Sequence, residues 1–416
     1  MNILLCGADG FIGRALAAAL ARAGHTVRRA VRTPRLPGDI VVDYRRDLDP
    51  ACWRDRVRGC DAVINAVGIV RERRRGDFER IHHRAPGALW AACADEAVAR
   101  VIQISALGAQ TASTAYLASK AAADRALLGA LPGGVVLRPG LVFGVDGASS
   151  QLFLTLASLP LIGLPGGGSQ RLRPIHIDDL CALVLALLQR QTGEHRIIEA
   201  VGGEELSFAQ MLAAYRRTLG FAPAISFRLP EALMSAGAKL AGRIPGSLLT
   251  PETWQMLRAG NTAAVGDTAR LLGRLPRAPD RFMSGVQAER LRVRLLARWR
   301  DRLMRAALAM VWIGSGLVSL AVPQTGLDLL GAFGLSGAAA WVVLVGASVL
   351  DISLGAATLL RPGRRLWLAQ IAIVALYSAL IAWRLPALLV HPFGPVLKNL
   401  PIVAMLVLLW AQARSA

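Results

Sequence analysis

The chain has 416 residues, of which 54% are apolar, and its mean hydropathy of +0.44 is high for a wholly soluble protein. The formal net charge is +20, but the basic residues are spread along the chain and form no single stripe with interleaved aromatic residues, which argues against nucleic-acid binding. The five cysteines include no CxxC pair, so we expect reduced thiols and no metal site.

The N-terminal residues predict a strand, a glycine turn and the start of a helix. An apolar run over residues 3–6 is followed by three spaced glycines and then by an Ala/Leu-rich segment. The first glycine permits a tight turn, the second lets the backbone approach a pyrophosphate, and the third lets the helix pack close to the strand. Free N–H groups at the helix start would face the phosphates. We therefore predict a dinucleotide site that includes Gly7, Asp9, Gly10, Phe11, Ile12 and Gly13.

Strand-like and helix-like segments alternate up to residue 140, which predicts an α/β fold with a doubly wound parallel sheet. The further strands are expected at Thr26–Val31, Ile40–Val42, Ala62–Val67, Val101–Ser105 and Gly134–Leu137. The clearest helical runs are Ile81–Glu96 and Leu117–Leu131. Because no cleavable signal precedes the first strand, we expect this domain to stay in the cytoplasm.

Three loops at the carboxyl ends of these strands would complete the cofactor site. Arg32 ends the second strand, where an NAD enzyme usually presents an acidic residue, and a guanidinium there favours the 2′-phosphate of NADP. We predict NADP but leave NAD open, because Arg32 could also be a solvated surface arginine. Asp43 could bind the adenine amino group or belong to an ordinary loop. A cofactor could lie across the strand tips at the small residues of Asn65, Ala66, Val67 and Gly68.

Several motifs occur in one order along residues 1–285. They are the glycine turn, the segment 65–68, Ser105, the YxxxK sequence from Tyr116 to Lys120, Arg138-Pro139-Gly140, and the segment 174–179. On these residues the chain resembles the short-chain dehydrogenase/reductase superfamily in its extended or atypical branch. The resemblance implies a Rossmann fold, Ser105, Tyr116 and Lys120 as catalytic residues, and Lys120 and Pro139 among the cofactor contacts.

The implied chemistry is acid–base catalysis at a hydroxyl or carbonyl group. Tyr116 and Lys120 are four residues apart and so share a helix face, where the lysine charge would favour the tyrosine phenolate. Ser105 would donate a hydrogen bond to the substrate oxygen while Tyr116 exchanges a proton. By resemblance Lys120 would also bind the nicotinamide ribose. An incidental Tyr/Lys pair on an exposed helix is the alternative.

Two features near these residues depart from the commoner family pattern. Many relatives have an asparagine in the helix after the fourth strand, which supports a proton relay, whereas this chain has Ile81-His82-His83 there. We therefore expect an altered relay. The short spacing from Ser105 to Tyr116 is similar to the atypical branch, which includes a nucleotide-binding accessory subunit of respiratory complex I.

We expect four parts in the chain. These are an NAD(P)-binding Rossmann domain over 1–205, a small substrate-binding region over 206–285, a basic amphipathic linker over 286–302 and a transmembrane domain over 303–413. In the second part the apolar helix Ala232–Leu240 suggests a hydrophobic ligand. The linker alternates arginines with apolar residues, as does a helix that lies on an inner leaflet, although a solvated connector is also possible.

Four apolar stretches follow residue 302, at Leu303–Val322, Ala338–Leu360, Leu366–Leu385 and Leu400–Ala413. The first three are long enough to cross a hydrocarbon core of ~30 Å as helices, and the fourth is short. Arginines precede the first stretch and separate the second from the third, which places both positions on the cytoplasmic side. We predict a multi-pass inner-membrane protein whose N-terminal domain and C-terminus are cytoplasmic.

The membrane part resembles the DoxX-like family of four-helix proteins in Asp351, Gly355, Arg361 and the segment 391–399. An ionisable group within a span is costly and normally faces the bundle interior or water. Gln370 and Tyr377 are candidate partners of Asp351. A structural hydrogen bond and a proton-related or quinone-related role are equal alternatives for this carboxyl group.

These features predict a membrane-anchored, NAD(P)(H)-dependent oxidoreductase that acts on a lipophilic carbonyl, alcohol or quinone-like small molecule. Membrane lipid is an expected partner, and the DoxX-like bundle could bind membrane proteins. One alternative is a nucleotide-binding assembly or sensor protein of a respiratory membrane that performs no catalysis. Another is a sugar-nucleotide epimerase, which uses the same three side chains.

Overall fold

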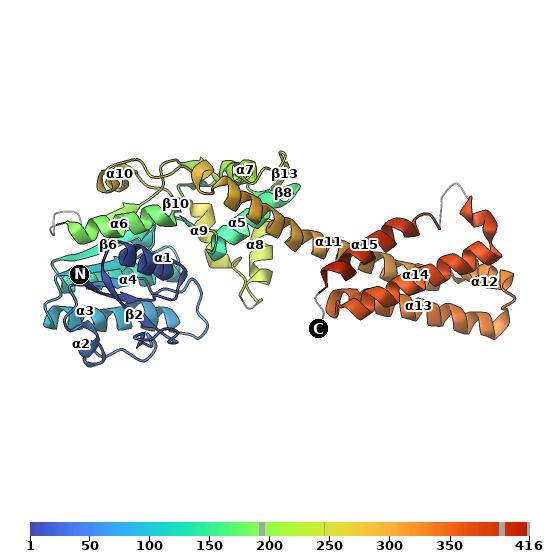
Figure 1. Cartoon of the computed structure of the whole chain (residues 1–416), viewed down its shortest axis with the longest axis horizontal. Helices are drawn as coiled ribbons and strands as arrows, with labels where there is room; N and C mark the ends of the chain where they lie inside the picture. Colours follow the sequence, from blue (N-terminus) through green and yellow to red (C-terminus); the bar gives the residue numbers. More distant parts are fainter. Residues whose placement is uncertain (191–195, 245, 391–395, 414–416) are drawn as a thin grey trace. The chain divides into compact units, whose positions relative to one another are not determined.

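The computed structural model describes residues 1–190, 196–244, 246–390 and 396–413. The chain divides into two compact units, Met1–Arg292 and Val293–Ala416 (Figure 1). The first unit is built around a parallel sheet covered by helices, and the second consists of helices. This confirms the predicted order of an α/β fold followed by an apolar helical region.

Seven parallel strands form the main sheet in the order β11-β6-β5-β4-β1-β2-β3. They span Asn2–Cys6 (β1), Thr26–Val31 (β2), Ile40–Val41 (β3), Ala62–Asn65 (β4), Arg100–Ile104 (β5), Gly134–Pro139 (β6) and Ile197–Ala200 (β11). The order runs outward in both directions from β1, as a doubly wound sheet requires. Strand β4 ends two residues earlier than the sequence predicts, so Ala66 and Val67 belong to the loop that follows it.

Helices cover both faces of this sheet because successive side chains of a strand point to opposite sides. Ile3 and Leu5 of β1 pack on one face with helices α1 (Phe11–Arg22) and α6 (Ile177–Gln189). Leu4 and Cys6 pack on the other with α2 (Ala51–Val57), α3 (Ala85–Asp95) and α4 (Ala115–Ala130). A π-helical segment, η1 (Glu79–Arg84), leads directly into α3. The nearly continuous apolar sequence of the strands follows from burial on both faces.

Three short strand pairs and five helices complete the first unit. The pairs are β7 (Val142–Phe143) with β10 (Ile175–His176), β9 (Arg171–Leu172) with β12 (Leu206–Ser207), and β8 (Leu161–Pro165) with β13 (Ile225–Leu229). The helices are α5 (Ala148–Ser158), α7 (Phe208–Thr218), α8 (Glu231–Ala241), α9 (Pro251–Ala259) and α10 (Gly266–Leu272). Short one-turn helices lie at Ala109–Thr111 (η2) and Pro279–Arg281 (η3). The domain boundaries at 205 and 285 remain a prediction.

Among the described residues, three helices are long and apolar enough to cross a membrane. They are α11 (Gly285–Ala321), α13 (Gly337–Leu360) and α14 (Arg364–Arg384), with the shorter α12 (Pro323–Ala332), η4 (Pro386–Leu389) and α15 (Asn399–Gln412). Helix α11 begins in the first unit and includes both the predicted linker and the first predicted span. Residues 391–395 of the predicted segment 391–399 lie outside the described part.

Glycines let α11 and α13 approach each other closely. A Cβ on Gly316 would lie 2.6 Å from the Ser348 carbonyl oxygen, and one on Gly355 would lie 3.1 Å from that of Ala309. Small residues at such contacts are typical of helix packing in membranes. The first and second predicted spans therefore pack directly against each other.

Polar side chains are also buried between the membrane helices. Trp312 Nε1 donates to Gln370 Oε1 at 2.9 Å, and Gln370 Nε2 donates to Thr358 Oγ1 at 2.7 Å. Gln370 is thus bonded to other side chains than the expected Asp351. The Asp351 side chain is buried, and its Oδ1 has no hydrogen-bond partner among the described residues.

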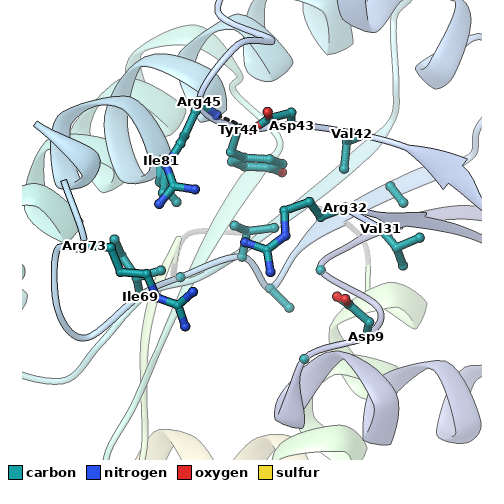
Figure 2. A pocket seen from close by; sticks show the side chains of 16 residues that line it. Asp9, Val31, Arg32, Val42, Asp43, Tyr44, Arg45, Ile69, Arg73 and Ile81 are labelled. Carbon is teal, nitrogen blue, oxygen red and sulfur yellow. Dashed lines mark hydrogen bonds between the residues drawn. The ribbon is translucent and has the colours of Figure 1, made fainter. Parts of the chain in front are cut away.

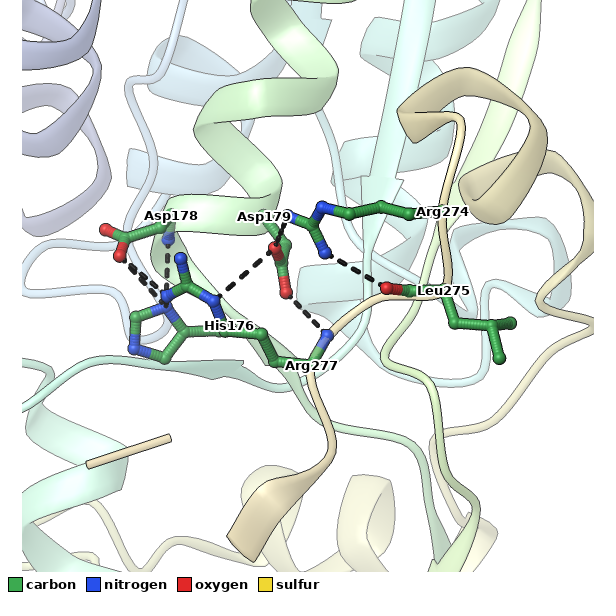
Figure 3. A network of polar contacts seen from close by, with 6 residues as sticks. All are labelled: His176, Asp178, Asp179, Arg274, Leu275 and Arg277. Atoms are coloured by element: carbon green, nitrogen blue, oxygen red, sulfur yellow. Dashed lines mark hydrogen bonds and ion pairs between the residues drawn. The ribbon is translucent and has the colours of Figure 1, made fainter. Parts of the chain in front are cut away.

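A network of charged groups fastens the first turn of α6 to residues 274–277 (Figure 3). The fully buried Asp179 carboxylate accepts hydrogen bonds from the Arg274 side chain and the Arg277 backbone N–H. His176 caps the helix, because its Nδ1 accepts from the Asp178 backbone N–H at 3.2 Å. This arrangement supports the structural role expected for His176, whose pKa is lowered chiefly by burial.

We predict that Asp179→Asn lowers the free energy of unfolding by about 1–3 kcal/mol, because it replaces the buried carboxylate that accepts from Arg274 and Arg277 with a neutral amide. Asp178→Asn is the matched control in the same helix turn. The Asp178 side chain is 57% exposed, and we expect its ion pair with Arg277 to contribute at most about 1 kcal/mol. Denaturant unfolding of the full chain in detergent measures both variants. Equal losses would show that burial of Asp179 is unimportant.

Candidate active site

The glycine turn between β1 and α1 depends on close backbone contacts. Gly7 has a φ of +78°, and its carbonyl oxygen accepts from Gly10 N at 3.0 Å. A Cβ on Gly13 would lie only 2.0 Å from that same oxygen, so no larger residue fits without moving the backbone. Helix α1 begins at Phe11, after a glycine with no side chain to cap it, which leaves N–H groups available for an anion.

A cleft of about 280 Å³ opens beside this turn (Figure 2). Eight of the residues predicted to bind the cofactor line it: Gly7, Asp9, Gly10, Arg32, Asp43, Ala66, Val67 and Gly68. They come from the loops that follow β1, β2, β3 and β4, at the carboxyl edge of the parallel sheet. This is the edge at which ligands bind in open α/β sheets.

Four other predicted cofactor residues, Phe11, Ile12, Gly13 and Pro139, are not among the lining residues of this cleft. A Cβ on Gly144 would meet the Phe11 ring at 2.7 Å, so Phe11 packs over that loop. Gly13 is in the close contact described above, Ile12 occupies the same turn of α1, and the Pro139 carbonyl oxygen accepts from Leu107 N. The contact of these four residues with a cofactor remains a prediction.

A buried hydrogen-bonded chain stiffens the loop after β4. Asn65 Oδ1 accepts from the Tyr44 hydroxyl at 2.9 Å and from the Val67 N–H at 3.1 Å. Asn65 Nδ2 donates to Gln103 Oε1 on β5 at 2.8 Å. Asn65 therefore holds the loop in place without lining the cleft. Tyr44, which was not predicted from the sequence, is one of the residues that line the cleft.

Arg32 and Arg73 extend their guanidinium groups into the cleft from opposite sides (Figure 2). Within the described residues neither group forms a hydrogen bond or an ion pair. Arg45 also lines the cleft, but it is committed to two hydrogen bonds of 2.8 Å with the Asp77 carboxylate, which hold the pKa of Asp77 far below its usual value. Two unpaired cations thus remain to attract a phosphate group.

Lys120, one helical turn after Tyr116 on α4, reaches the loop after β4 and the end of β5 directly before Ser105. Lys120 is buried, and its Nζ donates to the carbonyl oxygens of Ile104 at 3.2 Å and Val67 at 3.5 Å. A Cβ on Gly68 would lie 3.0 Å from this Nζ, so the ammonium group adjoins the lining of the cleft. Burial lowers the pKa of Lys120 to about 8, against a smaller opposing effect of Asp124.

The electrostatics of Tyr116 differ from the sequence-based expectation. Its pKa is raised to about 12, first by burial and then by the negative charge of Asp124. The Lys120 ammonium group donates to main-chain carbonyl oxygens. Contrary to the expectation from the sequence, it therefore does not favour the phenolate form of Tyr116. Burial raises the pKa of the Asp124 carboxyl group, and the nearby Ser105 partly offsets this rise. The buried Ser105 Oγ has no partner at hydrogen-bonding distance among the described residues.

His82 occupies the position near the expected asparagine and connects two parts of this site. The Ile69 N–H donates to His82 Nε2 at 2.9 Å, and His82 Nδ1 lies 2.7 Å from Ser119 Oγ. Ser119 Oγ in turn donates to the Tyr116 carbonyl oxygen at 2.7 Å. Burial and the nearby Lys120 charge lower the pKa of His82 to about 2, so the ring is neutral. Nε2 must accept, and the proton is therefore on Nδ1.

Family models match both parts of the chain. The NAD dependent epimerase/dehydratase family matches residues 3–201, and the DoxX-like family matches residues 309–407. The first match covers the glycine turn, the cleft and the Ser105, Tyr116 and Lys120 group. The second covers most of the membrane helices.

Three curated relatives are similar over parts of their length. The mitochondrial NADH dehydrogenase [ubiquinone] 1 alpha subcomplex subunit 9 of Arabidopsis thaliana is 28% identical over 60% of this chain and 66% of its own. The ceramide reductase of Caulobacter vibrioides is 28% identical over 57% of this chain and 76% of its own. The corresponding rat subunit 9 is 30% identical, over 42% and 49%. The chain thus spans just under two thirds of the plant subunit and about half of the rat subunit.

Solved structures share the fold of the first unit. A human epimerase family protein with NADPH superposes with a TM-score of 0.53 and 21% identity, over 70% of this chain and 99% of its own. The UDP-glucuronic acid 4-epimerase of Bacillus cereus, solved with UDP-glucuronic acid and NAD, gives 0.51 and 19%, over 71% and 99%. The match to the NAD dependent epimerase/dehydratase family supports a nicotinamide dinucleotide as the cofactor class. The chain thus joins a Rossmann domain similar to the short-chain dehydrogenases/reductases, which matches the NAD dependent epimerase/dehydratase family, to a C-terminal domain that matches the DoxX-like family.

Proposed function

We propose that the protein is a membrane-anchored, NADP-preferring oxidoreductase that reduces a lipophilic carbonyl compound by means of Ser105, Tyr116 and Lys120. The observation that carries this proposal is the position of Lys120, whose ammonium group adjoins Gly68 in the lining of the cofactor cleft. Tyr116 lies one helical turn earlier on α4, and Ser105 directly follows β5. A substrate oxygen near both hydroxyls would also be near the cleft.

The residues fit a nicotinamide dinucleotide. The glycine turn leaves room for a backbone approach and offers N–H groups, and the β4 loop is lined by small residues. When bound, the nicotinamide supplies the hydride. Lys120 would bind the nicotinamide ribose through its charge. Arg32 and Arg73 would bind the 2′-phosphate, which is the basis for proposing NADP.

The site is better suited to donating a proton than to accepting one. With a pKa near 12, Tyr116 stays protonated at neutral pH, so it can act as the general acid on a carbonyl oxygen. The buried Ser105 Oγ has no partner at hydrogen-bonding distance among the described residues, so it can donate a hydrogen bond to the same oxygen. This combination favours reduction over oxidation at neutral pH.

The membrane helices and one relative support a lipophilic substrate. The relative from Caulobacter vibrioides is named a ceramide reductase, and the three long apolar helices would keep the first unit near lipid. We place the protein in the cytoplasmic membrane with the first unit and the C-terminus in the cytoplasm, because arginines cluster in the part of α11 that precedes its apolar half.

The main rival function is nucleotide binding without catalysis, in an assembly or sensor protein of a respiratory membrane. The similarity to subunit 9 of NADH dehydrogenase favours it, and the DoxX-like unit would then bind membrane-protein partners. Sugar-nucleotide epimerisation is supported only by the fold of the first unit. Intact Ser105, Tyr116 and Lys120 favour the enzyme over the assembly protein.

Tyr116→Phe should lower the rate of NADPH oxidation with a long-chain ketone by about 10²–10⁴-fold, because the proton donor is removed. NADPH affinity should change little, since the phenyl ring keeps the packing. Absorbance at the NADPH band measures the rate for the full chain in detergent, and nicotinamide fluorescence measures binding. Tight NADPH binding without oxidation of any lipophilic carbonyl by the parent protein would favour the assembly or sensor function.

Arg32→Ala should weaken NADPH binding by about tenfold or more and leave NADH binding nearly unchanged, because a charge-assisted contact to the 2′-phosphate is lost. Arg73→Ala should act in the same direction. Arg35→Ala, an exposed arginine outside the cleft lining, is the matched control. Fluorescence titration with both nucleotides measures the effect. Equal weakening of NADPH and NADH, or tighter binding of NADH by the parent, would contradict the NADP assignment.

His82→Phe should lower kcat by about tenfold or more, because Tyr116 loses its link through Ser119 to the β4 loop and small displacements are costly. His82→Gln, which can both accept and donate, should recover part of the loss. Since His82 stays neutral, the parent pH profile should show no limb near pH 6 that disappears in His82→Gln. Such a limb, or an unchanged kcat in His82→Phe, would exclude this positioning role.

A further inference from the structure

Helix α8 presents large apolar side chains on its outward side. Leu233, Leu240 and Ile244 are 58%, 65% and 60% exposed. They are spaced by seven and then four residues, and this spacing places them on one side of a helix and its C-terminal extension. We call these three residues the α8 stripe. The apolar sequence of this helix suggests a hydrophobic ligand, and its two leucines are exposed on the surface of the unit.

The inward side of α8 has its own partners. Ala238 is fully buried, and Ser235 Oγ accepts from Trp254 Nε1 of α9 at 3.0 Å. The orientation of α8 is therefore fixed by packing within the first unit. Among the described residues, nothing covers the α8 stripe.

Two cations accompany the α8 stripe. Lys239 and Arg243 are exposed neighbours of Leu240 and Ile244, and among the described residues their side chains form no ion pair. An apolar face bordered by basic side chains is the composition of helices that bind anionic membrane surfaces. A contact with another soluble protein would not require these free cations beside the leucines.

We propose that the α8 stripe, with Lys239 and Arg243, lies on the surface of the bilayer that the C-terminal helices span. The same chain continues through α11 into the apolar helices, so a bilayer is always within reach of the first unit. A covalent tether raises the effective concentration of a second, weak contact, and three large apolar residues with two cations are enough for such a contact.

The docking surface is linked to the cofactor cleft. Arg71 donates to the carbonyl oxygens of Gly242 at 2.5 Å and Ile244 at 3.2 Å. Arg71 belongs to the same loop as Ile69 and Arg73, which line the cleft. If the proposed reduction of a lipophilic substrate is correct, the substrate can leave the lipid beside this loop, which lines the cleft. The membrane contact itself does not depend on that chemistry.

The test uses the full chain with Cys52→Ser, which removes the one exposed native cysteine, and with Leu240→Cys carrying a bimane fluorophore. The protein is reconstituted into vesicles of phosphatidylcholine and phosphatidylglycerol with brominated acyl chains. Leu36→Cys, at a leucine of similar exposure, is the matched control. We expect at least about twofold stronger quenching at position 240, because a docked face is buried ~5–10 Å into the lipid boundary.

A double substitution tests the contribution of the two cations separately from that of the covalent link to the membrane helices. Lys239→Glu combined with Arg243→Glu should reduce the quenching at position 240 in these anionic vesicles and leave quenching at position 36 unchanged. Equal quenching at positions 240 and 36 would overturn the proposal. Cross-linking between unlabelled Leu240→Cys copies, together with no lipid quenching in the labelled protein, would also overturn it, in favour of a second copy of the chain on this surface. The readout needs no substrate, so failure of the proposed chemistry would not affect it.

Discussion

The buried ammonium group of Lys120 is the interaction on which the candidate site depends. Removing a charge from water is costly, and the low pKa of Lys120 records that cost. The carbonyl oxygens of Val67 and Ile104 compensate part of it, and in doing so they bind α4 to the loop after β4 and to the end of β5. Because the loop after β4 lines the cleft, one hydrogen-bonded cation holds α4, which carries the proposed proton donor Tyr116, beside the carboxyl edge of the sheet.

His82 adds a second connection between the same elements, and it is neutral. The π-helical segment η1 brings this ring between Ile69 and Ser119, from which a hydroxyl reaches the Tyr116 carbonyl. A charged histidine beside Lys120 would add repulsion to the cost of burial. The neutral ring instead uses both nitrogens in hydrogen bonds, so it can position Tyr116 without competing for its proton.

The sequence predicted those features that depend on residues close together along the chain. The glycine turn, the parallel strands and the shared helix face of Tyr116 and Lys120 all follow from spacing and backbone geometry. Arg73 could not be distinguished, because it lies in an arginine-rich run after β4 and only the folded loop turns it into the cleft. The effect of Lys120 on Tyr116 was also unpredictable, since it depends on carbonyl groups distant in sequence. For α8 the helix was predictable, but which side faces outward depends on the contact with Trp254.

Two surroundings, water for the first unit and lipid for the second, account for the composition of the chain. The first unit buries its apolar residues in a doubly wound sheet, and the second leaves apolar helices for lipid, with close contacts where Gly316 and Gly355 admit a neighbouring helix. Among the described residues Arg32 and Arg73 remain unpaired at the cleft, where they would attract phosphate groups of a nucleotide.

Isotope transfer tests the central claim most directly. The full chain in lipid nanodiscs would be incubated with NADPH deuterated at the transferable position and with membrane lipid extract, and the lipids analysed by mass spectrometry. We predict deuterium on a carbon bearing a new hydroxyl group in a lipid product, and its loss in Tyr116→Phe. Tight NADPH binding with no deuterium in any lipid would contradict hydride transfer to a lipophilic substrate.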